Sequence, residues 1–507
     1  MKANLSLFLN RCLWLFCICA TAGVFLLNLV FLTTVSYDLH EHVSYHTPVL
    51  STIAALVLWA GILFLVIRFK KCFCKLDEKR LFLLLASIYS LIAAYLILNT
   101  DLAIRYDAKE VSDAALAAME NRFDAFQPGN YLSIYPHQVG LMLYDMLLYT
   151  FSKNLAVHLL SNFVMVLGIE YLAYRLGDLI FANHTVNLAV IFFSFAFLPQ
   201  LFLILFAYGN IPAFFFLYLA FYHTLKFIQT HRIRHLVVLL LSSAVSVLIR
   251  NNSLIGVIAI LIILTLDMLK RFCFKQVLAI LLLIAAALLP GKLLSAHFFE
   301  KADVEPSSGI PAILWIAMGT NLDNHARGPG WYDASSYFAY QDTGYDSQAA
   351  GEIGKQRLVQ NLRNMYHAPL ETVKFFGRKT ISQWCDPLFQ SIWSGPLPNS
   401  EQVVHTDLLY SLYTGGSIEN ILCLMMRIYM IGIWGFAAYY LLCKKQTDSA
   451  WQLFYLFFLG GLLFHTLWEG KSQYIFQYAF CLVPFAAAAF VKAAQQLSSR
   501  YRAKPSI

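Results

Sequence analysis

Long apolar runs separated by short polar connectors dominate the chain. A helix needs roughly 20 apolar residues to cross a bilayer, and twelve runs approach that length, so the pattern predicts an all-α polytopic membrane protein with about twelve transmembrane helices. The first run follows Arg11 and is too long for a cleaved signal peptide, so it is expected to remain as a helix. The predicted spans lie near residues 11–36, 49–68, 81–100, 155–175, 183–205, 208–226, 235–250, 252–269, 276–294, 421–442, 450–468 and 475–495.

Basic residues are concentrated in the connectors between these runs. They lie in Lys70–Arg80, Lys226–His235, Lys270–Lys275, Lys444–Lys445 and the C-terminal tail with Arg500 and Arg502. Cytoplasmic loops of membrane proteins are enriched in Lys and Arg, so these connectors are expected in the cytoplasm. With twelve spans they all fall on one side of the membrane, and both chain ends share that side.

A shorter apolar segment, residues 139–153, affects this count. As a full span it would move the later basic connectors 226–235 and 270–275 to the outside, against the positive-inside rule. The segment is therefore predicted to be an interfacial or re-entrant amphipathic helix on the outer face. Asp145 within it and Glu300 are then both expected to be reachable from outside.

Two polar segments are predicted on the outer face, from about Asp101 to His137 and from about Ser295 to Asn420. The other outer connections are expected to be tight turns. The predicted parts of the chain are an N-terminal helical pair (1–80), a transmembrane core (81–294) with outer interfacial helices at 101–153, an outer loop or cap (295–420), and C-terminal transmembrane helices with a cytoplasmic tail (421–507).

The composition agrees with a lipid environment. Of the 507 residues, 59% are hydrophobic and 13% are charged, whereas about a quarter of the residues of a soluble domain are charged. The net charge of +8 lies in the connectors, which indicates membrane topology and argues against nucleic-acid binding. The lipid bilayer is thus an expected partner, and nucleic acid is not.

The first outer segment contains a candidate catalytic carboxylate. An interfacial helix is predicted just after the third span, with Asp107 on its first turn. The helix dipole stabilises a carboxylate at that place, so Asp107 is either a simple helix-start residue or a general base within reach of a lipid-bound substrate. Further along, the motif Tyr135-Pro136-His137-Gln138 opens a short helix and is expected to face the same polar interface.

The segment Tyr131-Leu132-Ser133-Ile134-Tyr135-Pro136-His137-Gln138-Val139-Gly140-Leu141 fits a YL-x-x-YPHQ-x-GL pattern. Together with the early Asp and the later spans, it resembles the bacterial GT-C glycosyltransferases, the superfamily of protein O-mannosyltransferases and aminoarabinose transferases. The resemblance covers most of residues 80–495. It implies a GT-C fold and inverting transfer of a sugar from a polyprenyl-phosphate donor to an extracytoplasmic glycan or polymer acceptor, such as a Gram-positive cell-wall polymer.

The resemblance also implies roles for individual residues. Asp107 is the expected catalytic base for the acceptor hydroxyl. Cations at the outer boundary are expected to bind the donor phosphate, although such side chains also snorkel to lipid headgroups. The candidate phosphate ligands are Arg250, Lys471, Arg427 and Arg378. The candidate sugar-binding residues are His137, Gln138, Tyr135, Glu469, Tyr474 and Trp331, the last of which is alternatively part of the core of a small cap.

Two positions depart from the family pattern. Gln473 stands where the family usually has Arg before a Tyr, and Lys471 is expected to supply that charge. Asn210 occupies an outer turn where related sequences often carry Asp, which favours a mechanism without metal. No cofactor is expected, and a divalent metal, if one binds, would be held by Asp107 and Glu110.

Two other functions stay open. A glycan polymerase or ligase would use outer Arg and His groups and would not need the carboxylate of Asp107. A lipid-linked sugar transporter or flippase would favour internal repeats, broken helices and charges at the bilayer midplane. No internal repeat is evident, and Glu170 and Asp145 are the main charged residues within apolar runs.

Overall fold

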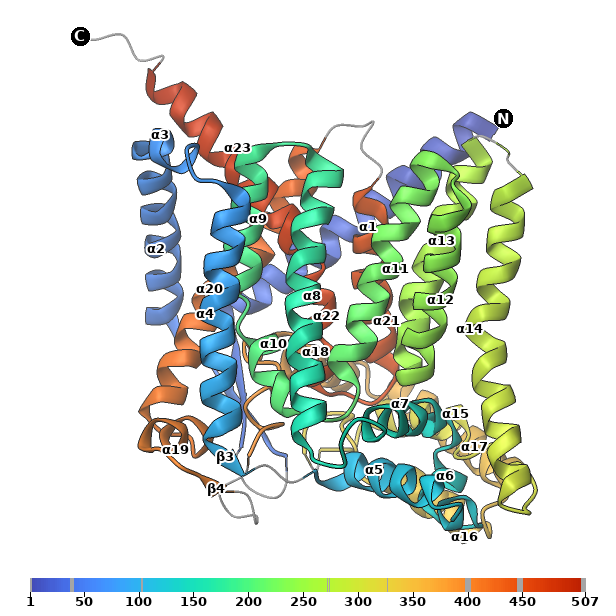
Figure 1. The fold of residues 1–507 in the computed structure, drawn as a ribbon. Helices are drawn as coiled ribbons and strands as arrows, with labels where there is room; N and C mark the ends of the chain where they lie inside the picture. Colours follow the sequence, from blue (N-terminus) through green and yellow to red (C-terminus); the bar gives the residue numbers. More distant parts are fainter. Residues whose placement is uncertain are drawn as a thin grey trace.

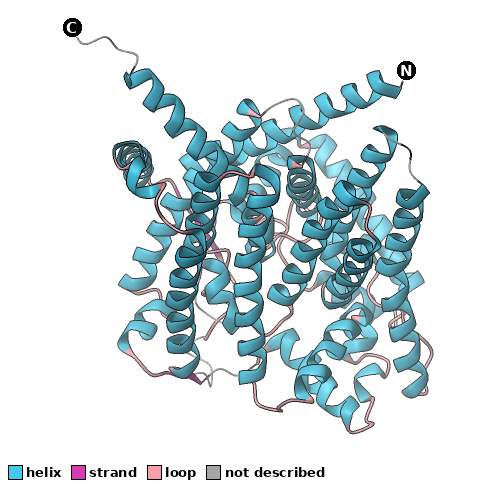
Figure 2. Cartoon of the chain, turned by 45° about the horizontal axis from the view of Figure 1, so that its top comes forward, coloured by secondary structure: helices cyan, strands magenta, loops and turns pink. Residues whose placement is uncertain are grey.

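The computed structural model describes residues 2–36, 41–101, 104–270, 272, 274–325, 327–396, 403–444 and 450–502. Over these ranges the chain is almost entirely helical, with four short strands (Figure 2). The prediction of an all-α polytopic membrane protein is confirmed at this level. Lys445 and the side chains of Arg500 and Arg502, which contributed to the predicted topology, lie outside what the structure describes.

Nine helical segments of the described chain are long and apolar enough to cross a membrane. They are α1 (Lys2–Val30), α2 (Val49–Arg68), α4 (Glu78–Leu98), α8 (Ala156–Phe181), α11 (Asn210–Thr230), α13 (Leu254–Lys270), α14 (Phe274–Lys301), α20 (Ser417–Cys443), and α22 (Phe476–Phe480) continuing into α23 (Val483–Arg502). The short α3 (Lys70–Phe73) follows α2.

The three remaining predicted spans are helical but less regular. α9 (His184–Ala196) meets α10 (Pro199–Phe202) and the 3-10 turn Leu203–Leu205 at an angle of 46°. α12 (Ile233–Ile249) and α21 (Trp451–Leu467) are apolar but have only 17 residues each. Each predicted apolar run therefore contains a helix, and the full count of twelve crossings stays a prediction.

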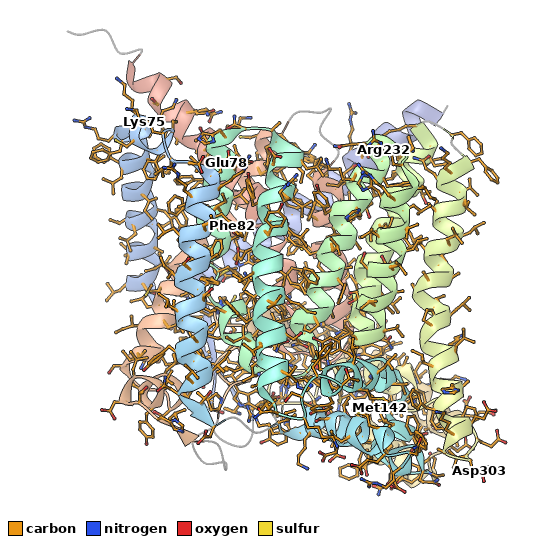
Figure 3. The ribbon with its side chains drawn as sticks, viewed as in Figure 1. Lys75, Glu78, Phe82, Met142, Arg232 and Asp303 are labelled. Atoms are coloured by element: carbon orange, nitrogen blue, oxygen red, sulfur yellow. The ribbon has the colours of Figure 1, made fainter. Side chains whose placement is uncertain are left out.

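The helices run roughly parallel between two ends of the molecule (Figure 1). The start of α1 and the end of α23 lie at the upper end, where Lys75 and Arg232 also lie (Figure 3). Met142 and Asp303 lie at the opposite, lower end (Figure 3). The basic connectors at these points thus share a side with both chain ends, as the positive-inside pattern requires.

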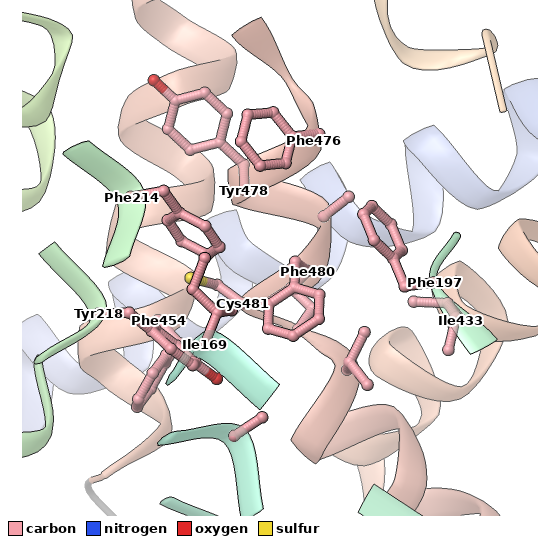
Figure 4. Close-up of a cluster of buried hydrophobic side chains, with 14 of the residues drawn as sticks. Ile169, Phe197, Phe214, Tyr218, Ile433, Phe454, Phe476, Tyr478, Phe480 and Cys481 are labelled. Atoms are coloured by element: carbon pink, nitrogen blue, oxygen red, sulfur yellow. The ribbon is translucent and has the colours of Figure 1, made fainter. Parts of the chain in front are cut away.

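The centre of the bundle is filled by aromatic side chains (Figure 4). The rings of Phe214 and Tyr218 from α11 lie 5.8 Å from the ring of Phe480 in α22, measured between centroids. Phe454 of α21 lies 6.3 Å from Tyr218. Edge-to-face contacts of this kind hold rings in fixed orientations, so they fix the short α22 in the centre of the bundle, directly after the turn Ser472–Tyr474.

The predicted outer helices lie at the lower end of the bundle. They are α5 (Tyr106–Met119), α6 (Tyr131–Ile134) and α7 (Val139–Tyr149), with 3-10 turns at Asp124–Phe126 and Pro136–Gln138. α5 buries a face of mostly small residues, made of Ala108, Val111, Ala114, Ala115 and Ala118. α7 has 11 residues, too few to cross a bilayer, and lies across the lower end beside α5 (Figure 1).

One prediction about α7 is wrong. Asp145 is only 3% exposed, and its carboxylate lies 3.2 Å from Nε2 of His158 in α8. A carboxylate so buried needs a polar partner, and the helix turns this side chain inward to find one. Asp145 is therefore not reachable from outside.

The segment predicted as an outer cap is also helical. It consists of α15 (Ala312–Gly319), α16 (Ser335–Asp342), α17 (Ser347–His367), α18 (Pro369–Trp384) and α19 (Asp407–Tyr413). Strand β3 (Thr100–Asp101), directly after α4, pairs with β4 (Val403–Val404) before α19, so the cap is tied to the first outer segment.

The connection between α1 and α2 is not the predicted tight turn. The first helix ends at Val30, and β1 (Leu32–Val35) pairs antiparallel with β2 (Val43–His46). These segments are rich in Thr and Val, whose branched side chains favour extended backbone. The first span is therefore shorter than predicted, and a β-hairpin at the lower end carries Glu41 into the cap.

Cysteine labelling tests the orientation of the bundle. Lys153→Cys and Glu300→Cys place a thiol at exposed positions near the lower end, and Lys75→Cys and Arg232→Cys place one at the upper end. In a background without other accessible cysteines, a membrane-impermeant maleimide is expected to label the first two in intact cells and the others only after permeabilisation. The reverse pattern would contradict the predicted outer face.

Candidate functional site

Asp107 lies on the first turn of α5 at the lower end of the bundle (Figure 1). Its carboxylate accepts a long hydrogen bond from the Tyr208 hydroxyl, at 3.4 Å. The Asp107 side chain is exposed to solvent. Protein atoms packed around it still remove part of the water that would stabilise the charged form, and this desolvation raises the pKa of the carboxyl. The nearby charges of Lys471 and Arg250 lower this pKa, and the charge of Glu41 raises it.

Arg250 stands where α12 ends and the chain enters a 3-10 turn at Asn251–Ser253. Its guanidinium carbon lies 4.3 Å from the centroid of the Tyr208 ring and 5.9 Å from that of Tyr474. Among the described residues it forms no ion pair with a carboxylate. A guanidinium that is held by aromatic rings but has no anionic partner suits a phosphate group.

The turn after α21 supplies a second carboxylate and a second cation. Burial raises the pKa of Glu469 to about 7, Lys471 lowers it, and the charges of Glu41 and Asp107 raise it further. Nζ of Lys471 lies 2.5 Å from a carboxylate oxygen of Glu41 and 5.1 Å from the centroid of the Trp393 ring. Unlike Arg250, Lys471 therefore already has an anionic partner.

Glu41 comes from the hairpin between α1 and α2 and is 2% exposed. Besides the Lys471 ammonium, its carboxylate contacts Nη1 of Arg327 and Nε2 of Gln390, each at 3.5 Å. The sequence predictions did not include Glu41. The available signal was the length of the polar stretch between the first two apolar runs, about a dozen residues with an acidic side chain, which is more than a tight turn needs.

His137 and Gln138 follow the Pro-initiated turn before α7. Nε2 of Gln138 donates to the Tyr208 hydroxyl at 2.7 Å, which in turn donates to Asp107. Desolvation by the surrounding protein lowers the pKa of His137 to about 4, and Arg250 lowers it too, so this ring is neutral at neutral pH. The ring of Tyr135 lies 6.1 Å from that of His137.

Lys379 of α18 fastens the cap to the turn that carries Glu469. Its Nζ donates to the carbonyl oxygens of Gly319, at 2.5 Å, and Trp468, at 2.6 Å. Burial lowers the pKa of this fully buried amine to about 7. Gly330 has a φ of +68°, and a Cβ there would lie 2.6 Å from the Gly319 carbonyl oxygen, so only glycine fits. The amide of Gly470 donates to the Gly330 carbonyl at 2.9 Å.

Three predicted site residues lie elsewhere or are covered. Arg427 is 3% exposed and donates to the Phe31 carbonyl and the Thr52 hydroxyl, which ties α20 to α1 and α2. Arg378 is exposed on α18, and no described contact joins it to Asp107. Trp331 is fully buried, donates from Nε1 to Ser382 and has no free face on which a sugar could stack.

The structure thus brings together most of the predicted site, namely Asp107, Arg250, Lys471, Glu469, Tyr474, His137, Gln138 and Tyr135. Tyr208 and Glu41 also belong to this site, although the sequence did not predict them. Tyr208 stands beside Gly209, whose φ of +75° starts α11 and turns the tyrosine toward α5.

A narrow polar pocket lies behind Arg250, lined by amide side chains that include Asn210, Asn252 and Gln473. Its open volume is about 20 Å³, enough for roughly one water molecule or a single phosphate oxygen. The buried Nδ2 of Asn210 has no hydrogen-bond partner. Among the described residues no group of three His, Cys, Asp or Glu side chains is arranged to hold a metal ion, and Glu110 is exposed on α5.

No family model matches the chain, and no curated protein matches it. The resemblance to GT-C glycosyltransferases therefore stays a prediction.

Proposed function

We propose that this chain is a membrane glycosyltransferase of the GT-C type, which transfers a sugar from a polyprenyl-phosphate donor to an acceptor hydroxyl outside the cytoplasm. The observation that supports the proposal is the meeting of Asp107 and Arg250 on either side of Tyr208. One is a solvent-open carboxylate, and the other is a cation without an ion-pair partner among the described side chains. A base for the hydroxyl and a cation for the phosphate are the groups that such a transfer requires.

In the proposed reaction the acceptor oxygen attacks the anomeric carbon of the sugar while the bond from that carbon to the phosphate oxygen breaks. Asp107 accepts the proton of the attacking hydroxyl. The bonding electron pair leaves with the lipid phosphate, whose charge Arg250 offsets. A single displacement inverts the anomeric centre. Glu469 and Tyr474, beside the cation, are proposed to hydrogen-bond the sugar hydroxyls.

A lipid-linked sugar transporter is the second candidate, and one observation favours it. Glu170 is fully buried within α8, and Gln200 from the bent α9–α10 segment donates a hydrogen bond to it. A buried ionisable side chain beside a broken helix is typical of transport pathways. No such pathway needs the base and the cation at the lower end.

Reconstitution into liposomes separates the two candidates. A radiolabelled polyprenyl-phosphate hexose is supplied with a crude acceptor fraction from the outer cell surface. The glycosyltransferase is expected to release unglycosylated polyprenyl phosphate in proportion to the label that enters the acceptor fraction. Movement of intact donor across the bilayer without cleavage of the sugar–phosphate bond would contradict the proposal and support transport.

A further inference from the structure

The N-terminal helical pair contributes a side chain to the candidate site. Glu41 lies between strands β1 and β2 of the hairpin that joins α1 to α2. It reaches the turn after α21, where its carboxylate pairs with Lys471 at 2.5 Å. The two residues lie at opposite ends of the sequence, so this contact depends on the complete fold.

The position of Glu41 is fixed independently of its ion pair. The amide of Thr33 donates to the Cys385 carbonyl, and the amide of Val43 donates to the Arg327 carbonyl, each at 3.0 Å. Arg327 approaches the second carboxylate oxygen at 3.5 Å. Backbone hydrogen bonds on both strands thus hold the hairpin against the cap, and the Glu41 carboxylate is a fixed anchor rather than a mobile counter-ion.

Lys471 has two carboxylates besides Glu41 in its surroundings. Its charge acts on both Asp107 and Glu469. The described structure nevertheless contains no ion pair between Lys471 and either of them, because Glu41 and the Trp393 ring hold the ammonium. An ammonium free to pair with Asp107 would stabilise the carboxylate and weaken it as a base.

We infer that Glu41 is a positioning residue of the site, which keeps the Lys471 ammonium from pairing with Asp107 so that Asp107 stays available as a base. The inference rests on the proposed function, since it takes Asp107 to accept a proton. It also makes the N-terminal helical pair part of the active unit rather than only a membrane anchor.

Removing the charge of Glu41 is expected to change the pKa of Asp107, which can be tested. Glu41 raises the pKa of Asp107, whereas Lys471 lowers it. In Glu41→Gln one raising influence is lost and the released ammonium is free to approach, so both changes lower the pKa of Asp107. Other charged or titratable groups also surround the carboxylates of Glu41 and Asp107. They are Arg105, Tyr131, Tyr135, Tyr208, Arg250, Arg327, Tyr332, Glu469, Lys471 and Tyr474.

The first measurement does not depend on activity. Acylation of lysines by an amine-reactive ester is followed by mass spectrometry in the purified full-length protein. Lys471 is expected to react several times faster in Glu41→Gln/Asp107→Asn than in either single variant, because only the double variant lacks both Glu41 and the carboxylate that would replace it. Lys374, an exposed residue paired with Glu371, serves as the internal reference. Equal rates at Lys471 in the double variant and in Glu41→Gln would overturn the inference, whatever the activity, because Asp107 would then not take the released ammonium.

The second measurement is the pH profile of kcat/KM for sugar transfer. The acid limb is expected to move to lower pH in Glu41→Gln, to stay near the wild-type position in Glu41→Asp, and to stay unchanged in the exposed control Glu371→Gln. The double variant Glu41→Gln/Lys471→Gln is expected to be more active than Glu41→Gln alone, since no ammonium remains to pair with Asp107.

These outcomes separate the inference from the proposed function. A variant that loses activity equally at all pH values, with its acid limb in place, has only a structural defect, and the positioning role is then wrong. Absence of transfer in the wild type contradicts the proposed function, whereas the acylation rate of Lys471 still decides whether Glu41 holds it.

Discussion

Replacing Asp107 by Asn is expected to reduce sugar transfer by at least about 100-fold, the lower range for loss of a general base. The amide keeps the shape of the side chain, and its carbonyl oxygen still accepts the hydrogen bond from Tyr208. The variant loses the negative charge of the side chain and with it the ability to take a proton. The measurement is the initial rate of polyprenyl phosphate release by purified protein in liposomes at saturating donor, where the effect falls on kcat.

The matched control for this variant is Asp113→Asn. Asp113 is on the same helix but is 55% exposed and pairs with Lys109 at 2.7 Å on the solvent face. Exposed pairs of this kind contribute little to stability, so this variant is expected to keep the wild-type rate. A near wild-type rate in Asp107→Asn would show that Asp107 is not the base. It would favour a glycan polymerase or ligase, which does not need this carboxylate.

Replacing Arg250 by Gln is expected to raise the KM for the polyprenyl-phosphate donor by roughly 10- to 100-fold. A hydrogen bond to a charged group contributes about 1.5–3 kcal/mol, and about 1.4 kcal/mol corresponds to a factor of ten in affinity. Gln keeps polar contact with the Tyr208 carbonyl, which accepts from Arg250 at 3.4 Å, but provides no charge. Initial rates at varied donor concentration and fixed acceptor measure this change.

Arg378→Gln is the control for the charge alone. Arg378 was predicted as a phosphate ligand, but it is exposed on α18 and no described contact joins it to Asp107 or Arg250, so its removal is expected to leave the donor KM unchanged. If Arg378→Gln raises the donor KM and Arg250→Gln does not, the phosphate site lies on the cap and not beside Tyr208. Arg250→Lys should recover part of the affinity for the donor, because lysine restores the positive charge but lacks the planar guanidinium that can make two parallel hydrogen bonds to a phosphate.

The helices were the most predictable part of the fold. Apolar runs of about 20 residues have few alternatives to helix in a membrane, because each backbone polar group must find its partner within the segment. The interfacial helix at α5 was predictable for a local reason too, since its small residues repeat on one face. Asp107 could therefore be placed on the first turn of α5 before any contact was known.

The partners of Asp107 were not predictable in the same way. Tyr208 contacts Asp107 and Glu41 acts on it through its charge, both from distant parts of the chain. Residues of these two types are common in aromatic-rich or polar connectors. Trp331 was predicted as a sugar-binding residue but lies in the core. An aromatic residue in an outer segment fits a sugar platform as well as a core, and only the hydrogen bond to Ser382 and full burial of the ring assign it to the core.

The sequence also did not predict correctly where the first span ends. The apolar character after Val30 continues into Thr33 and Val35, so hydropathy alone extends the first span past the point where the backbone becomes a strand. For Asp145 the missing information was its partner, because His158 lies on the following helix and draws the carboxylate inward.

The pairing of Glu41 with Lys471 has a consequence for how the protein is made. Synthesis proceeds from the N-terminus, so Glu41 is made with the first helices, and Lys471 follows only with the turn after α21. During the interval the partly inserted chain carries the carboxylate without this cation. The site is complete only after the final helical hairpin has been inserted, so a nascent or C-terminally truncated chain is expected to carry no transfer activity, even with Asp107 and Arg250 already in the membrane.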